Sequence, residues 1–316
     1  MTRRRTVLAT LTAAAVLLLG ATGCEPPPPV PTFQVDNFGP GADTAPGDGV
    51  CEAAAPGSGC SLQAAVDEAN AHSQAIVVAP GDDNTAYAPI TATITGKVTM
   101  RAQGTSEGNS LSIPAATLEV AVGGVLNIEG VDVESGTLRV DGLFVGHRIA
   151  VRAFDVGASG QVFVTNGVLL PTGETPALMN AGHVWLRFTT VALFSGAGGL
   201  ATVGAGETNI GATAILASNP LATTCHGTPP ISAGYNAVTN NGCSLTGVGD
   251  IQNAPLGTLP YPPAGSPQID AIESGVLGCG TTVTTDGRGF PATRPVDSSG
   301  IGDARCDIGA YEVQPA

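Results

Sequence analysis

Four acidic residues followed by two arginines form the densest group of side chains able to do acid–base chemistry in the middle of the chain. They are Glu129, Asp132, Glu134, Asp141, Arg148 and Arg152. A polysaccharide lyase needs carboxylates that hold Ca²⁺ together with a strong base, and a glycosidase needs two carboxylates on one face. Charged edges are also what a secreted protein with apolar coils requires. We favour that second interpretation and assign no catalytic residue.

A second acidic group lies near the C-terminus, where Asp297, Asp303 and Asp307 follow Asp286. Carboxylates on irregular loops suit Ca²⁺, so the first three are the candidate Ca²⁺ ligands, and no other cofactor is predicted. We expect Arg288 to pair with Asp307 and hold this region together. The four histidines lie in unrelated contexts, without the spacing of a catalytic triad or a zinc site.

The elements that must position these residues are short strands with a recurring pattern of glycine, any residue, apolar, any residue, apolar. The pattern begins at Gly124, Gly136, Gly160 and Gly182, at spacings of 12, 24 and 22 residues. One coil of a parallel β-helix has about this length, so we expect the pattern to mark one face, with the 12-residue step as a half-turn. A β-sandwich would instead show even alternation between regular hairpin turns. The pattern therefore favours stacked coils.

The residue between the two apolar positions of each pattern should point outward from the coil. Arg139, Phe163 and Trp185 occupy this position. Stacked strands lie about 4.8 Å apart, so the two rings are expected to form a ladder beside an arginine. Such a surface can bind sugars through apolar and cation–π contacts. These residues are the candidate ligand surface, and the alternative is that a long loop covers them.

The chain has seven cysteines. Apart from Cys24, they fall into three local pairs, Cys51 with Cys60, Cys225 with Cys243, and Cys279 with Cys306. An oxidising compartment would join each pair across a short loop rich in glycine and proline, where a disulfide compensates for thin packing. The spacing does not match that of a metal site.

Residues 1–23 have the form of an export signal, with three arginines followed by an apolar run from Val7 to Leu19. The run is shorter than the roughly 20 residues that span a membrane. Ala21-Thr22-Gly23-Cys24 resembles a bacterial lipobox, which implies that Cys24 carries a lipid; ordinary cleavage is the alternative. The proline-rich residues 24–32 would form a stiff tether. General and twin-arginine export both stay open.

Composition narrows the range of partners. Only 12% of residues are charged, which is too few for a typical disordered chain. The 44 glycines and 24 prolines are too many for a mainly helical chain. The net charge of −14 repels nucleic-acid phosphates and anionic headgroups. We expect a monomer that meets the membrane only through its lipid and binds no nucleic acid.

Two regions carry a family resemblance. A helical pattern starts after Ser61, and Cys60-Ser61-Leu62-Gln63-Ala64-Ala65 resembles the CSLREA motif. Three C-terminal pieces, at 265–270, 286–290 and 306–312, resemble the module called choice-of-anchor Q. Both occur in bacterial surface proteins built as parallel β-helices, in which a terminal helix is expected to cover the open end of the core.

These observations predict an all-β protein, a right-handed parallel β-helix with a short N-terminal capping helix and a disulfide-stapled C-terminal cap. The expected parts are a signal peptide (1–23), a tether (24–32), an N-terminal cap with coils (33–224), and final coils with a cap (225–316). The expected function is that of an exported, lipid-anchored protein of the cell envelope, facing outside the cytoplasm, that binds like an adhesin, with glycans as ligands. The alternatives are a β-helical polysaccharide lyase or glycosidase, and a purely structural envelope protein.

Overall fold

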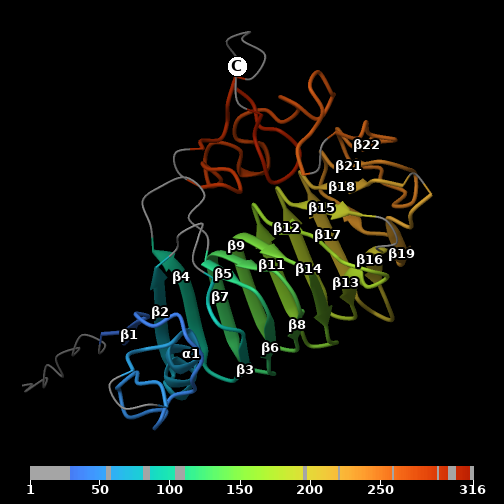
Figure 1. The fold of residues 1–316 in the computed structure, drawn as a ribbon. Coiled ribbons are helices and arrows are strands. Elements are labelled where there is room, and N and C mark those ends of the chain that lie inside the picture. The colour runs from blue at the N-terminus through green and yellow to red at the C-terminus, as the bar shows by residue number, and fades with distance from the viewer. Residues whose placement is uncertain are drawn as a thin grey trace, which may run out of the picture.

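The computed structural model describes residues 29–54, 58–80, 86–103, 111–194, 198–219, 221–257, 260–289, 292–297 and 304–313. The predicted leader, Cys24, the first part of the tether and Asp303 lie outside these ranges. The described chain winds into a parallel β-solenoid, with coil upon coil along one axis (Figure 1). Every pairing between its named strands is parallel, which confirms the predicted parallel β-helix.

The first face of the solenoid is a seven-stranded sheet to which each successive coil from β3 to β19 contributes one strand. Its strands are β3 (Ile90–Ile94), β6 (Ala116–Val120), β8 (Thr137–Val140), β10 (Ala153–Val156), β13 (Pro176–Asn180), β16 (Gly198–Thr202) and β19 (Cys225–Gly227).

The second and third faces belong to one 15-stranded sheet that bends at a corner. The second face contains β1 (Thr32–Gln34), β2 (Gln74–Pro80), β4 (Lys97–Gln103), the first parts of β7 (Val125–Val133) and β9 (Leu143–Val151), β11 (Gln161–Thr165), β14 (His183–Arg187), β17 (Glu207–Gly211) and β20 (Ile231–Ser232). The third face contains β5 (Leu111–Ile113), the last parts of β7 and β9, β12 (Val168–Leu169), β15 (Thr190–Leu193), β18 (Ala214–Ala217), β21 (Ala237–Val238) and β22 (Ile251–Gln252).

The core is a column of apolar side chains stacked in register. On the second face Phe144 pairs with Val162, which pairs with Val184, and all three are fully buried. Leu138 of β8 points inward in the same way on the first face. Alternation in each strand places every second residue inside, and each buried side chain contributes about 1.5–3 kcal/mol. Stacking therefore gives short strands the core that none of them has alone.

From β7 onward, one residue per described coil adopts a left-handed backbone conformation where the second face turns into the third. This corner is formed by Gly130, Arg148, Asn166, Phe188, Ala212, Tyr235 and Asn253, with φ between 48° and 68°. Glycine and asparagine are the usual residues for such a conformation, whereas phenylalanine and tyrosine are uncommon there. The corner turns the chain sharply and directs its side chains away from the core.

The two ends of the core are closed by different elements. At the N-terminal end lies α1 (Leu62–Ala71), the predicted helix, whose Ser61 side chain accepts a hydrogen bond from the Ala64 N–H at 3.0 Å. Leu62 and Val66 of this helix join the main core. At the other end, Cys243 and Leu245 are buried against the last coil. The apolar column is thereby shielded from water at both ends.

All three predicted cysteine pairs are disulfides. The Cα–Cα distances are 5.1 Å for Cys51–Cys60, 4.9 Å for Cys225–Cys243 and 6.0 Å for Cys279–Cys306. Disulfides persist in extracellular or otherwise oxidising surroundings, which is where this protein belongs. Separately, none of the helices in the described ranges has the length and apolar character needed to cross a membrane.

The recurring glycine pattern marks two faces rather than one. The pattern that starts at Gly136 runs through β8 of the first face, whereas the patterns at Gly124, Gly160 and Gly182 run through β7, β11 and β14 of the second. The 12-residue step therefore carries the chain from one sheet to the other. The expectations of a single marked face and of a half-turn were both wrong, because the 12-residue step crosses two of the three faces of a coil in which the register partners Val125 and Leu143 are 18 residues apart.

Candidate functional site

Residues 254–313, here called the C-terminal segment, pack against the outside of the third face. In Figure 1 the segment, in orange and red, lies beside β12, β15 and β18. Ala214 and Ala237 point outward from the third face yet are buried, because Ile272, Cys279 and the Ile308 side chain cover them in a second apolar cluster. The segment, which includes the 3₁₀ turn η1 (Val276–Gly278), thus covers the side of the solenoid.

The corner residues are the points to which the C-terminal segment is attached. The Asn166 amide donates to the Thr285 carbonyl at 2.7 Å. The Gly309 N–H donates to the Ala212 carbonyl at 2.9 Å. Next to the corner, the Thr190 hydroxyl accepts a hydrogen bond from the Ala310 N–H at 2.9 Å. The Asn166 and Thr190 contacts join parts of the chain that are 119 and 120 residues apart.

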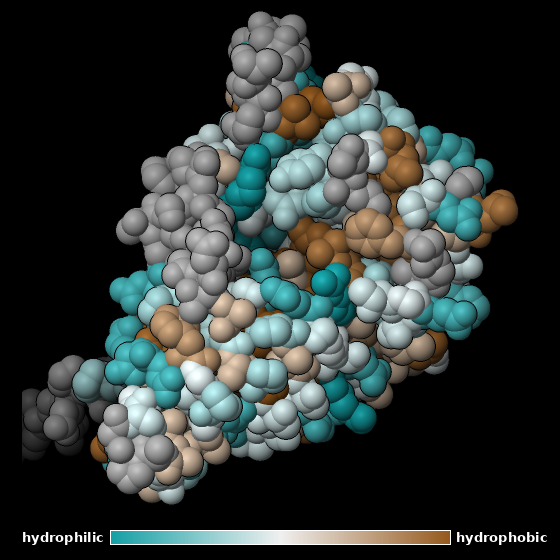
Figure 2. Space-filling view, viewed as in Figure 1, coloured by the Kyte–Doolittle hydropathy of each residue, from teal (hydrophilic) through white to brown (hydrophobic). Residues whose placement is uncertain are grey.

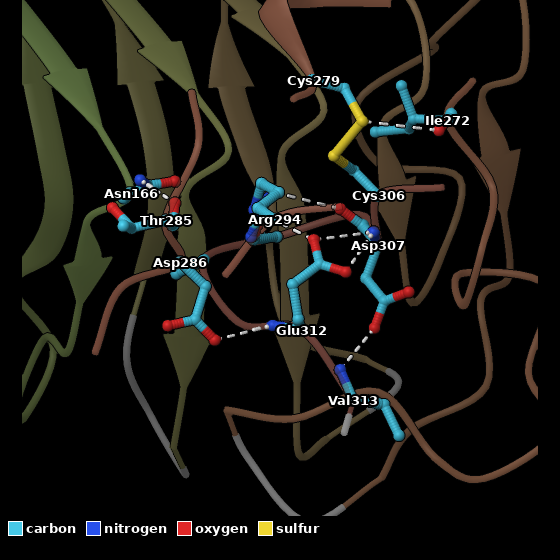
Figure 3. Close-up of polar contacts among 12 residues, drawn as sticks. Asn166, Ile272, Cys279, Thr285, Asp286, Arg294, Cys306, Asp307, Glu312 and Val313 are labelled. Atoms are coloured by element: carbon cyan, nitrogen blue, oxygen red, sulfur yellow. Dashed lines mark hydrogen bonds and ion pairs between the residues drawn. A yellow bond between two sulfur atoms is a disulfide. The ribbon is translucent and has the colours of Figure 1, made fainter. Parts of the chain in front are cut away.

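A buried arginine lies at the centre of this attachment (Figure 3). The Arg294 side chain is fully buried, and its Nε lies 2.9 Å from Oε1 of Glu312, which is also fully buried. Nε makes no hydrogen bond, so the pair is held by charge, while Nη2 donates to the Gly309 carbonyl at 3.0 Å. The guanidinium also lies over the ring of the corner residue Phe188, 4.3 Å from its centroid. Burial lowers the pKa of Arg294.

Three buried carboxylates surround Arg294 and Arg288. Asp286 accepts from Nε of Arg288 at 2.9 Å and from the Glu312 N–H at 3.0 Å. Asp307 accepts from the N–H groups of Asp270 and Val313, both at 2.7 Å. The expected pairing of Arg288 with Asp307 was wrong, because Arg288 lies against Asp286 instead.

Burial is the main cause of raised carboxyl pKa values in this network, and neighbouring carboxylates add to it. Burial raises the pKa of Glu312 to about 8, although Arg294 opposes the shift. Burial likewise raises the pKa of Asp307 to about 6. Two guanidiniums cannot neutralise three carboxylates, so the network takes up a proton near neutral pH.

The three C-terminal motif pieces meet in this network. Asp270 of the first piece donates through its N–H to Asp307 of the third. Gly287 of the second piece donates to the Ala310 carbonyl of the third at 2.6 Å. The motif residues therefore hold the segment together, and their role in the structure is one of attachment.

The candidate Ca²⁺ ligands do not form a metal site among the described residues, where we find no group of acidic, histidine or cysteine side chains able to hold a metal. Asp307 already accepts two N–H groups, which leaves its carboxylate poorly placed for a cation. Asp297 is half-buried, and Asp303 lies outside the described residues.

A pocket of about 140 Å³ lies where the C-terminal segment meets the corner, and we call it the seam pocket. Asp132, Arg148 and Asn166 line it from the coils, and Arg288 and Tyr311 line it from the segment. The Tyr311 ring lies 4.9 Å from that of Tyr261 and 6.0 Å from the Arg288 guanidinium. Burial, with Asp132 nearby, raises the pKa of Tyr311, so its phenol stays protonated.

The six residues considered for catalysis spread over different parts of the coils. Glu129 pairs with Arg148 at 3.2 Å and with Arg101 at 3.8 Å. Asp141 accepts from Arg139 at 3.1 Å. The remaining contacts pair Ser112 with the Glu134 carboxylate at 2.5 Å and Arg152 with the carbonyls of Glu134 and Leu170. Of the six, only Asp132 and Arg148 line the seam pocket.

The aromatic ladder is present on the second face. Phe163 and Trp185 are register partners on β11 and β14, with ring centroids 4.4 Å apart and planes inclined by 2°. Both are half-buried. His183 stacks on Trp185 at 5.9 Å, and the exposed Arg187 follows on the same side of the strand. The rings turn their faces toward each other and present their edges outward.

Arg139 does not belong to this ladder. It lies in β8 of the first face, in register with Glu119 and Asp155, and pairs with Asp141. The arginine that shares a strand with Trp185 is Arg187. The recurring pattern predicts Arg139 beside the rings only if it marks a single face, and it marks two.

Asn166, Tyr311 and Arg294 were missed from the sequence. Only Asn166 carried a signal, since an Asn-Gly pair at the end of a strand favours a left-handed turn.

No protein family, curated protein or solved structure matches this chain. The surface in Figure 2 shows polar residues with separate apolar patches on this side of the molecule.

Proposed function

We propose that this chain is an exported, lipid-anchored protein of the cell envelope that binds glycans on the second face of its solenoid. The observation that carries the proposal is the Phe163–Trp185 ladder, two stacked rings on the outer side of adjacent coils. The adhesin-like role expected from the CSLREA and choice-of-anchor Q resemblances belongs to the same proposal.

Export and anchoring are supported by two independent features. Three disulfides fit an oxidising compartment. The basic and apolar leader followed by Cys24 fits a lipoprotein signal, and the prolines after it would lift the solenoid away from the membrane. Mass spectrometry of the mature N-terminus tests this part: a diacylated Cys24 is expected, and an unmodified thiol would refute anchoring.

The ladder supplies an apolar ridge with polar side chains on either side. Gln161 and His183 precede the rings on their strands, and Thr165 and Arg187 follow them, so hydrogen-bonding groups line both sides. Sugars combine apolar C–H surfaces with hydroxyls that need both donors and acceptors. Because the ring faces are stacked on one another, the sugar would contact the ring edges and the flanking polar groups.

Binding fits the arrangement better than catalysis. Glu129 and Asp141 are held in local ion pairs, and the protonated phenol of Tyr311 is a poor base at neutral pH. A general base needs a pKa near the working pH, and burial raises the pKa of Tyr311 far above it.

Fluorescence tests the proposal directly, because Trp185 is the only tryptophan of the chain. Titration of the folded protein with a panel of polysaccharides should change the Trp185 emission in a saturable way. The Trp185→Ala variant, followed by calorimetry, should bind about 10-fold or more weakly, from the apolar area that the ring buries.

The matched control is Phe194→Ala, which removes an exposed aromatic ring from outside the ladder. This variant should bind as the wild type does. Equal binding by Trp185→Ala and wild type would refute the ladder as the site. Release of unsaturated or reducing sugar during the titration would instead favour the lyase or glycosidase.

A further inference from the structure

We infer that the seam pocket is a second binding site, built to hold one neutral sugar ring. It is separate from the ladder, and its lining does not include Phe163 or Trp185. The inference rests on an unsatisfied buried acceptor, on the mixture of donors and acceptors in the pocket, and on their charge balance.

The unsatisfied acceptor is Oδ1 of Asn166. The residue is only 1% exposed and lines the pocket. Its Nδ2 donates to the Thr285 carbonyl at 2.7 Å, which fixes the orientation of the amide. Oδ1, on the opposite side of the amide, has no hydrogen-bond partner among the described residues. Buried polar atoms are almost always paired in folded proteins, so this atom points to a missing donor.

The pocket offers both kinds of hydrogen-bonding group at close quarters. Arg148 and Arg288 carry only donors, and the protonated Tyr311 can donate as well. Asp132 and Asn166 supply acceptors. A hydroxyl group both donates and accepts, so a molecule with several hydroxyls can satisfy both sets at once. The Tyr311 ring adds an apolar surface for the C–H side of a sugar.

The charges in and around the pocket disfavour an acidic ligand. Arg148 already faces Glu129 at 3.2 Å, and Arg288 already faces Asp286. With Asp132 in the lining, the three carboxylates in and around the pocket outnumber the two arginines. A carboxylated sugar would find no surplus of positive charge, whereas a neutral sugar needs no counter-charge and only has to hydrogen-bond its hydroxyls.

Size and rigidity agree with a single ring. A volume of about 140 Å³ corresponds to about five waters of the liquid, which suits one sugar unit rather than a chain. The wall formed by the C-terminal segment is held in place by the buried network behind it, so little ordering is needed on binding. Gly289, with φ of +81°, lets the Arg148 guanidinium pass closely beneath the segment, where a Cβ would lie 2.1 Å from its Nη1.

Calorimetry with glucose, galactose, mannose, N-acetylglucosamine and, as the charged probe, galacturonate tests the inference. At least one neutral sugar should bind saturably and more tightly than galacturonate. The side-chain amide resonance of Asn166 should shift during that titration. The Asp132→Asn variant, which keeps shape and removes the charge, should bind that sugar about 10- to 100-fold more weakly, the range for one hydrogen bond to a charged group.

The control is Asp155→Asn, an exposed acid on the outer side of β10, which should leave binding unchanged. Trp185→Ala should also leave it unchanged, so failure of the ladder and failure of the seam pocket are separate results. The inference is overturned if no neutral sugar binds, in which case the pocket holds only water. It is also overturned if Asp132→Asn binds as tightly as the wild type, or if Asn166 shows no shift.

Discussion

Replacing Arg294 by methionine should loosen the C-terminal segment from the side of the solenoid. The change preserves most of the side-chain volume and the contact with Phe188, but it leaves Glu312 as a fully buried carboxylate without its arginine. Breaking a buried ion pair by removing one partner costs about 3–5 kcal/mol. We expect this loss to grow above pH 8, where Glu312 of the wild type is a carboxylate. At pH 6 the loss should be smaller, because Glu312, with its pKa of about 8, can take up a proton.

Two further variants make this measurement specific. The double variant Arg294→Met, Glu312→Gln removes both charges and should lose less stability than Arg294→Met alone. Arg305→Met breaks the exposed pair with Glu273 on the same segment, where the charges are 3.7 Å apart and the Glu273 side chain is 65% exposed. Such surface pairs contribute about 0–1 kcal/mol, so this control should change little.

The assay must follow the segment itself, since it can detach while the coils stay folded. The Gly309 N–H, which donates to Ala212, is a direct reporter, and its hydrogen exchange should accelerate in Arg294→Met. Urea unfolding gives the global free energy for comparison. Equal exchange rates in Arg294→Met and Arg305→Met would refute the reasoning that the buried pair attaches the segment.

Two other predictions concern proton uptake and the core. Burial raises the pKa of Glu312 to about 8 and that of Asp307 to about 6, so the folded chain holds protons that the unfolded chain releases. The free energy of unfolding should therefore fall as pH rises from about 5 to 8. Urea unfolding across this range checks the sign, and Glu312→Gln should flatten the slope of the free energy against pH. Phe144→Ala should lower the free energy of unfolding by about 3–5 kcal/mol, because it opens a cavity in the stacked core. Phe194→Ala, on the surface, should lower it by less than about 0.5 kcal/mol. Equal melting temperatures for the two variants would contradict the stacking.

The architecture could be predicted because each coil repeats the same pattern, in which every second residue of a strand is apolar and points into the core. Leu138, Val162 and Val184 were expected inside and lie inside. The short loops around the cysteines likewise allowed the three disulfides to be paired correctly. These features depend on local spacing, which a sequence displays directly.

The surface sites could not be predicted in the same way, because they depend on which face a strand joins. Arg139 and Phe163 share a sequence pattern yet lie on different faces. The corner is formed by residues as different as Arg148, Phe188 and Ala212, so composition gives no common signal for it. Arg294 resembles any exposed arginine until the fold brings Glu312 to it.

The attachment of the last residues to the middle coils also sets an order of events during synthesis. The hydrogen-bond partners of Asn166 and Thr190 lie 119 and 120 residues further along the chain and are made later. Because a ribosome makes the N-terminal coils first, the outside of the third face, which includes Ala214, stays exposed to water until most of the chain has been made. A chain that ends before residue 272 would therefore leave the outward-facing Ala214 and Ala237 side chains exposed to water.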